Sequence, residues 1–278
     1  MTEPRVSSMN VYWLEQTEAD VPAENDWLSA SEAVCLDAMR FPKRRTDWRL
    51  GRWTAKCALS AYLSVPAALE RFREMEIRAA LDGAPEAFVG GEPAALTISL
   101  SHRSGIAFCA VAAVDTYLGC DLEVVETRSP AFVADYFTAN EQARIARASS
   151  EDRNRLVTLL WSAKESALKA LRAGLRLDTR SVIADPLERS VGQSDWSPLS
   201  VRYVSLHLPE DRLSKAGLAE DRHSEGLYFG DHVFQGWWQE TNDIVRTLVS
   251  APPSDSPLPL EVPEHGVDRP CKFESKFG

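Results

Sequence analysis

The sequence lacks the marks of disulfide-bonded, zinc-binding and membrane-spanning proteins. Its five cysteines are odd in number and none belongs to a Cys-x-x-Cys pair, which argues against a disulfide framework or a structural zinc site. No stretch approaches the apolar run that is needed to cross a bilayer, and residues 1–10 have no apolar signal core. We therefore expect a cytoplasmic protein with reduced thiols and no membrane partner.

Basic residues are also in short supply. The chain of 278 residues has 31 Lys and Arg against 41 Asp and Glu, a formal net charge of -10. Proteins that bind nucleic acid carry an excess of basic residues to neutralise phosphates, so we expect no nucleic-acid partner. Any basic site must be local, and its ligand must be anionic.

What the sequence does contain is a mixture of helix and strand patterns. Helices are predicted at residues 26–39, 46–63, 140–147 and 153–172. Strands are predicted at residues 9–14, 96–100, 106–114 and 117–125, with a hairpin at 232–238 and 244–249. Residues 101–105 form a polar turn between two of these strands. Because helices and strands do not alternate strictly, the pattern favours an α+β fold.

The end of the chain differs from the rest in composition. Prolines interrupt every candidate element after residue 250: Pro252, Pro253, Pro257, Pro259, Pro263 and Pro270. We predict that residues 251–278 form a disordered tail, whose removal leaves the melting temperature nearly unchanged. The remainder is long enough for one large or two ordinary domains, and no internal repeat of fixed period is apparent in it.

Two motifs place carboxylates where they could act together. On the strand that holds residues 119–123 (Gly-Cys-Asp-Leu-Glu), Asp121 and Glu123 point to the same face because strand side chains alternate. Two neighbouring carboxylates repel each other unless a cation lies between them, and oxygen ligands suit Mg²⁺. An exposed edge strand with solvated acids is the alternative, and it is the commoner origin of an Asp-x-Glu triplet.

The second motif is the helical run 161–169 (Trp-Ser-Ala-Lys-Glu-Ser-Ala-Leu-Lys). Glu165 and Lys169 lie four residues apart on one face, which is also the favourable order of a simple ion pair. Glu165 could instead supply a third carboxylate to the same cation. Lys164 and Lys169 would then lie beside it and contact phosphate oxygens.

A basic stripe and a Ser-His pair complete the candidate residues. Arg45, Arg49, Arg52 and Lys56 share one narrow helical face, which is either a solvated surface or a docking site for a polyphosphate or an acidic partner. Residues 101–102 (Ser-His) could donate hydrogen bonds to a phosphate or could stabilise their own turn.

In their order and separation, these motifs resemble those of the 4'-phosphopantetheinyl transferase superfamily. The Ser-His turn, the Gly-x-Asp-x-Glu strand and the Trp-Ser-x-Lys-Glu-x-x-x-Lys helix are all complete here. Residues 137–141 also resemble that family's Phe-x-x-x-Glu segment. The resemblance covers roughly residues 9–250 and is greatest to the single-chain, two-half type that activates surfactin synthetase.

The resemblance implies two similar α/β halves, residues 1–114 and 115–250, packed as a pseudo-dimer around a central active site. It implies that Asp121, Glu123 and Glu165 bind Mg²⁺, with Glu165 and Lys169 as the catalytic residues. It also implies coenzyme A contacts from the following residues: Arg40, Arg45, Arg52, Ser101, His102, Lys164 and Lys169.

The reaction implied is transfer of 4'-phosphopantetheine from coenzyme A to a serine of an apo acyl or peptidyl carrier protein. The enzyme would be a monomer and would release adenosine 3',5'-bisphosphate. The family's Gly-Lys-Pro segment has no counterpart with a basic residue here, because residues 82–85 read Asp-Gly-Ala-Pro. A Mg²⁺-dependent phosphohydrolase and a non-catalytic protein that binds coenzyme A or a carrier remain the alternatives.

Overall fold

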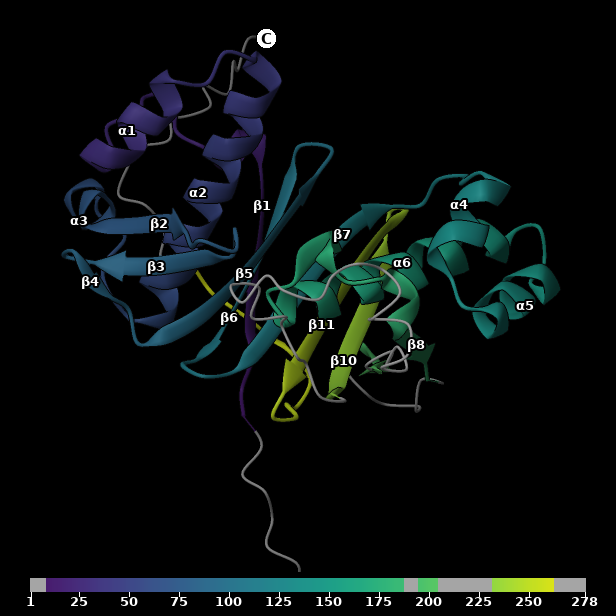
Figure 1. Cartoon of the computed structure of the whole chain (residues 1–278). Helices are drawn as coiled ribbons and strands as arrows, with labels where there is room; N and C mark the ends of the chain where they lie inside the picture. Colours follow the sequence, from purple (N-terminus) through teal and green to yellow (C-terminus); the bar gives the residue numbers. More distant parts are fainter. Residues whose placement is uncertain (1–8, 188–194, 205–231, 263–278) are drawn as a thin grey trace, which may run out of the picture.

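The computed structural model describes residues 9–187, 195–204 and 232–262 as a two-lobed α+β structure (Figure 1). This architecture confirms the predicted fold class. The helices are α1 (Ala30–Asp37), α2 (Pro42–Tyr62), α3 (Leu69–Glu74), α4 (Pro130–Tyr136), α5 (Ala139–Arg147) and α6 (Asp152–Ala170). Within the described residues, no helix is long and apolar enough to cross a membrane.

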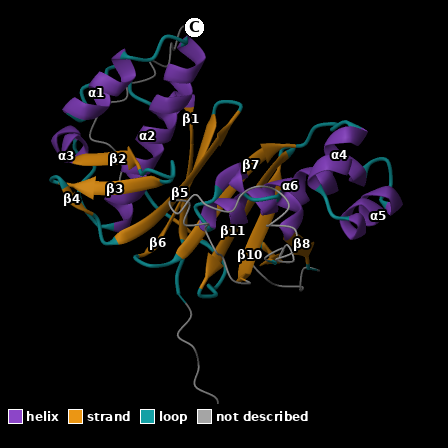
Figure 2. Cartoon of the chain, viewed as in Figure 1, coloured by secondary structure: helices purple, strands orange, loops and turns teal. Residues whose placement is uncertain are grey.

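Most strands belong to two antiparallel-rich sheets (Figure 2). The first sheet has the order β12-β1-β6-β5, with β1 Tyr12–Thr17, β5 Leu96–Arg103, β6 Ile106–Ala113 and β12 Leu258–Pro259. The second has the order β7-β11-β10-β9-β8, with β7 Tyr117–Val124, β8 Val182–Pro186, β9 Ser197–Tyr203, β10 His232–Thr241 and β11 Ile244–Ala251. A small sheet contains β2 (Met75–Ala79), β3 (Pro85–Val89) and β4 (Glu92–Pro93).

Alternation along the strands creates three layers of hydrophobic core. In β6, Cys109 and Val111 pack into the core beneath α2, while Phe108 and Ala110 face the opposite way. That second face meets Cys120 of β7 in a core between the two sheets. A third core lies between the second sheet and α6. Each long helix therefore covers the outer face of one sheet.

An ion pair also ties the two sheets together. Arg246 of β11 donates to both carboxylate oxygens of Glu15 in β1, and its guanidinium also donates to the Thr241 hydroxyl. The Arg246 side chain is 8% exposed. The predicted boundary at residue 114 falls in the loop between β6 and β7, but the pseudo-dimer arrangement stays a prediction.

Two sequence predictions need correction near the site. The strand predicted at residues 96–100 continues to Arg103, so Ser101 and His102 lie in β5 and not in a turn. The turn is made by Ser104 and Gly105, which both have positive φ. The helix predicted from residue 26 begins at Ala30, because Ser29 and Glu32 form a reciprocal capping box there.

The predicted disordered tail is wrong for residues 251–262. Strand β12 pairs in parallel with β1, Leu258 opposite Tyr12, and the Ser250 hydroxyl donates to Ser254. Leu260 and Val262 pack against the core beneath α2. Proline is tolerated at the edge of a sheet, so the proline-rich composition did not prevent this pairing. Residues 263–278 lie outside the described residues.

We call residues 252–262, which hold β12 and pack beneath α2, the strap. Their contacts replace the prediction that removal of the tail leaves the melting temperature nearly unchanged. A chain that ends at Ala251 should melt at least about 5 °C below the full chain, because loss of β12 and its apolar contacts removes a few kcal/mol. A chain that ends at Val262 serves as the control and should melt close to the full chain. Equal melting temperatures for the two truncated chains, measured by circular dichroism, would show that the strap contributes nothing.

Candidate active site

The site is built where β7 lies directly on α6. A Cβ atom at Gly119 would stand 1.8 Å from the carbonyl oxygen of Ser166 and 2.8 Å from the amide nitrogen of Ala170. No side chain fits in that space, so the glycine lets the strand touch the helix backbone. Asp121 and Glu123 follow on the same face of β7 and therefore point toward Glu165 and Lys169 of α6.

Asp121 is the best-anchored of the three carboxylates. Its Oδ1 accepts hydrogen bonds from the Ser101 hydroxyl at 2.8 Å and from Lys169 Nζ at 2.7 Å. Lys169 Nζ also donates to the Cys120 carbonyl oxygen at 2.9 Å. Burial lowers the pKa of Lys169, but Asp121 and the other nearby acidic groups outweigh it, so the pKa is raised overall and the ammonium stays charged.

Glu123 lies in a more basic surrounding. Trp161 Nε1 donates to its Oε1 at 3.3 Å, Arg128 lies 3.4 Å from its Oε2, and Arg103 Nε lies 3.7 Å from the same oxygen. Burial raises the pKa of Glu123 and the Asp121 charge raises it further, while the two arginines act in the opposite direction. The two arginines therefore do not fully offset the effects of burial and of the Asp121 charge on the pKa of Glu123.

Glu165 carries the strongest sign of missing positive charge. Burial, with the charges of Asp121 and then Glu123, raises its pKa to about 7 even though Lys169 opposes the shift. Its Oε1 and the Oδ2 of Asp121 are buried side-chain oxygens with no hydrogen-bond partner. Buried polar atoms are normally paired, so unpaired oxygens on two neighbouring acids indicate a place for a cationic group.

This donor set fits Mg²⁺ in chemistry, although not as a preformed cage. The three side chains offer only oxygen, which a hard divalent cation prefers. In residues 9–187, 195–204 and 232–262, no group of three His, Cys, Asp or Glu side chains is already gathered as a metal site. The carboxylates interact electrostatically, and Lys169 occupies the Asp121 oxygen that faces it.

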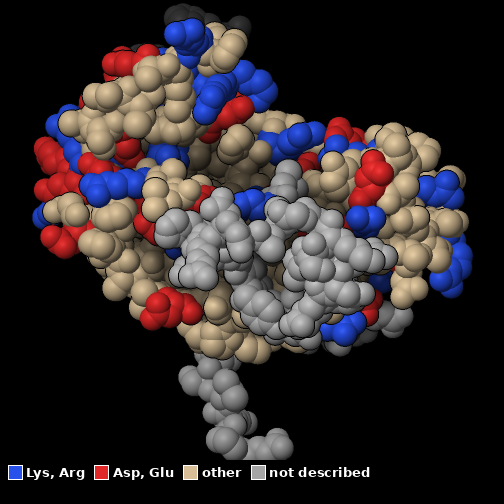
Figure 3. Space-filling view, viewed as in Figure 1, with Lys and Arg blue, Asp and Glu red and all other residues tan. Residues whose placement is uncertain are grey.

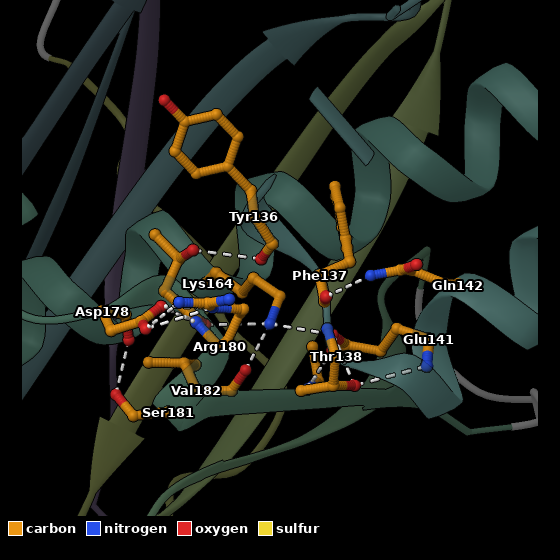
Figure 4. Close-up of polar contacts among 12 residues, drawn as sticks. Tyr136, Phe137, Thr138, Glu141, Gln142, Lys164, Asp178, Arg180, Ser181 and Val182 are labelled. Atoms are coloured by element: carbon orange, nitrogen blue, oxygen red, sulfur yellow. Dashed lines mark hydrogen bonds and ion pairs between the residues drawn. The ribbon is translucent and has the colours of Figure 1, made fainter. Parts of the chain in front are cut away.

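Lys164 does not belong to this cluster. Its ammonium is fully buried and pairs with Glu141 Oε2 at 2.9 Å (Figure 4). It also donates to the carbonyl oxygens of Thr179, at 3.0 Å, and Val182. Being next to Glu165 in sequence turns it about 100° around the helix, away from the carboxylates. The predicted phosphate contact from Lys164 is therefore corrected to a structural role.

The same arrangement occurs in the other lobe. Lys56 of α2 is fully buried and pairs with Glu32 Oε2 at 2.5 Å. Glu32 and Glu141 each close a capping box at the start of a helix, and each accepts a strand amide through Oε1, from Ile77 and Ala184 respectively. Each of these two lysines ends a short repeat that was not recognised from the sequence alone. The repeat reads Trp-Thr-Ala-Lys at residues 53–56 and Trp-Ser-Ala-Lys at residues 161–164.

The basic stripe on α2 is largely structural too. Arg45 donates to the carbonyl oxygens of Leu36 and Met39 at the end of α1, so it serves as a helix cap. Arg52 is 18% exposed, lies 3.9 Å from Glu32 and stacks on Trp48. Arg40 is exposed just before the helix. The contacts of Arg45 and Arg52 give no support to their predicted role in coenzyme A binding.

Ser101 and His102 point to opposite faces of β5, as strand alternation requires. Ser101 is engaged with Asp121, whereas His102 is exposed. Burial of part of its ring lowers the pKa of His102; the charge of Asp47 raises it, and those of Lys169 and Lys43 lower it again. Lys43 at the start of α2 is 82% exposed and was not singled out individually in the sequence.

A cavity of about 870 Å³ begins beside Lys169. Apolar residues of β3 and β5, including Phe88 and Ile98, form much of its lining, together with residues 169–172 at the end of α6. Figure 3 shows basic side chains on both sides of the recess between the lobe of α1 and α2 and the lobe of α4–α6. The cluster of carboxylates around residue 169 therefore lies beside a cavity that is lined by both apolar and polar residues.

A family model matches this part of the chain. Residues 117–215 match the family model described as the 4'-phosphopantetheinyl transferase superfamily. That segment holds Asp121, Glu123, Glu165 and Lys169, while Ser101, His102 and the basic stripe lie outside it. None of the curated proteins matches the chain. The resemblance read from the motifs is thereby confirmed, and the match supports a phosphopantetheine transferase activity in general.

The structural role of Lys164 predicts a stability effect. Lys164→Met leaves the buried Glu141 carboxylate without its partner and should cost about 3–5 kcal/mol in the free energy of unfolding. Adding Glu141→Gln removes the unpaired charge and should recover much of this loss, as measured by urea denaturation. If Lys164→Met kept normal stability but bound coenzyme A weakly, Lys164 would be a ligand contact after all.

The raised pKa of Glu165 predicts a pH dependence of stability. Between its ordinary value of 4.5 and about 7, the folded protein holds a proton that the unfolded chain has lost. Unfolding then releases a proton, so this group makes the fold less stable as pH rises through that window. In chelator, Glu165→Gln should become progressively more stable than wild type from pH 4.5 to pH 7. A difference that does not change with pH would contradict the raised pKa.

Proposed function

We propose that the protein transfers 4'-phosphopantetheine from coenzyme A to a serine of an apo acyl or peptidyl carrier protein, and the match of residues 117–215 to the 4'-phosphopantetheinyl transferase superfamily supports this proposal. The observation that carries the proposal is the cluster of Asp121, Glu123 and Glu165 around Lys169 within the matched segment. Two of its carboxylates have raised pKa values, which suits a site that receives a divalent cation and an anionic phosphate ester.

Asp121, Glu123 and Glu165 would hold Mg²⁺, with Asp121 Oδ2 and Glu165 Oε1 as the free oxygens. When bound, the metal supplies electrophilic stabilisation of the charge that develops on the pyrophosphate oxygens. Lys169 already lies at this position, and its ammonium would donate to a non-bridging oxygen of the phosphate under attack. The three acids would thus hold the cation, and the lysine would stabilise negative charge on the phosphate.

Glu165 is the proposed base. The carrier serine hydroxyl attacks the β-phosphorus of coenzyme A, a new P–O bond forms, and adenosine 3',5'-bisphosphate leaves with the electrons of the broken P–O bond. The hydroxyl proton passes to the carboxylate of Glu165. Without a cation, burial and the neighbouring acids raise the pKa of Glu165 to about 7, so its surroundings make it a stronger base than an exposed glutamate.

The rest of coenzyme A would lie in the recess beside Lys169. The cavity of about 870 Å³ has an apolar lining suited to the uncharged part of the substrate. His102, with Lys43 nearby, would meet the 3'-phosphate, and Arg40 stays a candidate phosphate contact. Arg45 and Lys164 are left out, because their charged groups are occupied by the contacts described above. Arg52 stays a candidate, because its buried Nε has no hydrogen-bond partner.

A panel of apo carrier proteins with coenzyme A and Mg²⁺ tests the proposal. Label from the pantetheine arm should appear on a carrier serine and not in free phosphopantetheine, which a hydrolase would release. Asp121→Asn and Glu165→Gln should each lower transfer by about a hundredfold or more, since a catalytic cation is worth several kcal/mol. Asp185→Asn, an exposed acid paired with Arg144, is the matched control and should retain activity.

Each variant needs a normal circular dichroism spectrum for the comparison to count. Label released only into water would favour a phosphohydrolase. Transfer at the wild-type rate by either site variant at saturating Mg²⁺ would remove that carboxylate from the site.

A further inference from the structure

One wall of the cavity beside Lys169 comes from a separate structural unit. Strands β2, β3 and β4 form a sheet that shares no strand pairing with the two larger sheets in the described residues. Residues 82–88, which are the turn between β2 and β3 and all of β3 except Val89, line the cavity. The other side of this sheet packs on the core beneath α2 through Met75 and Ile77, and the Ile77 amide donates to Glu32 Oε1.

The opposite wall is the end of the site helix. Residues 169–172 line the cavity, and Lys169 among them also contacts Asp121. Arg172 follows Leu171, the C-cap of α6, and has a φ of 54°, a left-handed conformation that ends the helix sharply. Its amide donates to the Lys169 carbonyl oxygen at 2.9 Å, which fixes the backbone of Arg172 against the last turn of α6.

Arg172 joins these two walls. Its Nε donates to Asp82 Oδ2 at 2.8 Å, and its terminal nitrogen donates to Asp82 Oδ1 at 3.2 Å and to Glu86 Oε1 at 2.7 Å. The two bonds to Asp82 make a bidentate pair, which fixes orientation as well as distance. Asp82 is itself oriented by the Ala84 amide, which donates to Oδ1 at 2.9 Å.

We infer that Arg172 is a positioning residue that clasps the β2–β3 turn to the end of α6 and thereby sets the width of the cavity. This rests on the proposed function only where it concerns coenzyme A. All three charged members of the clasp line the cavity, so the clasp holds two of its walls at a fixed separation. Asp82 and Glu86 neutralise the charge of Arg172, so we assign this residue to holding the two walls together and not to binding phosphate.

The strength of the clasp suits repeated opening. The side chains of Arg172, Asp82 and Glu86 are 46%, 26% and 42% exposed. Exposed pairs are screened by salt and contribute little each, so the walls can part without loss of the fold. In agreement with the geometry, hydrogen bonding to Arg172 lowers the pKa of Asp82, and Asp82 and Glu86 raise the pKa of Arg172.

The first test needs neither ligand nor activity. Hydrogen exchange of the amides in residues 79–89 should become several-fold faster in Arg172→Gln than in wild type at low salt. The matched control is Arg180→Gln, which removes an equally exposed arginine from a local pair with Asp178 that spans no cavity. It should leave exchange in residues 79–89 unchanged. Equal exchange in Arg172→Gln and wild type would overturn the proposal.

The second test measures the consequence for the substrate. Arg172→Gln should weaken coenzyme A binding by about two- to fivefold at low salt, the range expected of exposed pairs, with kcat unchanged. The difference should shrink near 1 M salt, where the Debye length falls to about 3 Å. Asp82→Asn should show the same loss, and the double variant should lose no more than either alone.

The outcomes separate this inference from the proposed function. If wild type neither binds coenzyme A nor transfers its arm, the proposed function fails, while the exchange experiment still decides whether the clasp exists. If exchange rises as expected but coenzyme A affinity is unaffected, the clasp does not set the width of a coenzyme A site and the inference is wrong. Additive losses in the double variant, or a fall in kcat alone, would likewise contradict a positioning role.

Discussion

Strand β7 can lie against the backbone of α6 only because residue 119 has no side chain. A methyl group there would stand 1.8 Å from the Ser166 carbonyl oxygen, and a close-packed interior cannot absorb such an overlap without moving the strand. Contact at Gly119 carries Asp121 and Glu123 toward the helix face that presents Glu165 and Lys169. The glycine of the Gly-x-Asp-x-Glu motif is therefore what allows the acids of the strand and those of the helix to lie close together.

The close approach places more negative than positive charge in a partly buried space. Elsewhere in the molecule, a buried lysine is matched by a glutamate and by backbone carbonyl oxygens, as in the pairs Lys56–Glu32 and Lys164–Glu141. At the site, Lys169 is shared between Asp121 and Glu165, and burial with the charges of Asp121 and Glu123 raises the pKa of Glu165 to about 7. The contrast distinguishes a fold-stabilising pair, which is complete, from a cluster that keeps unpaired carboxylate oxygens, where we propose that a cation and a phosphate bind.

The sequence predicted the fold class and placed the acids because both follow from short periodicities. Strand alternation puts Asp121 with Glu123, and helical spacing puts Glu165 with Lys169. It did not show which way Lys164, Arg45 and Arg52 turn, because a charged helix face carries no record of the acids and carbonyl oxygens that surround it in the fold. The strap at β12 was missed for a related reason: proline composition is typical of disorder, yet an edge strand needs few amide donors.

The central claim is that a divalent cation completes the acidic cluster by binding an ionised Glu165. Calorimetric titration of the protein with Mg²⁺ at pH 7, in two buffers of different ionisation enthalpy, measures the protons released on binding. With a Glu165 pKa of about 7, wild type should release about half a proton per ion bound, and Glu165→Gln should release none and bind more weakly. Heats that are the same in both buffers for wild type, or an unchanged proton release in Glu165→Gln, would contradict the account.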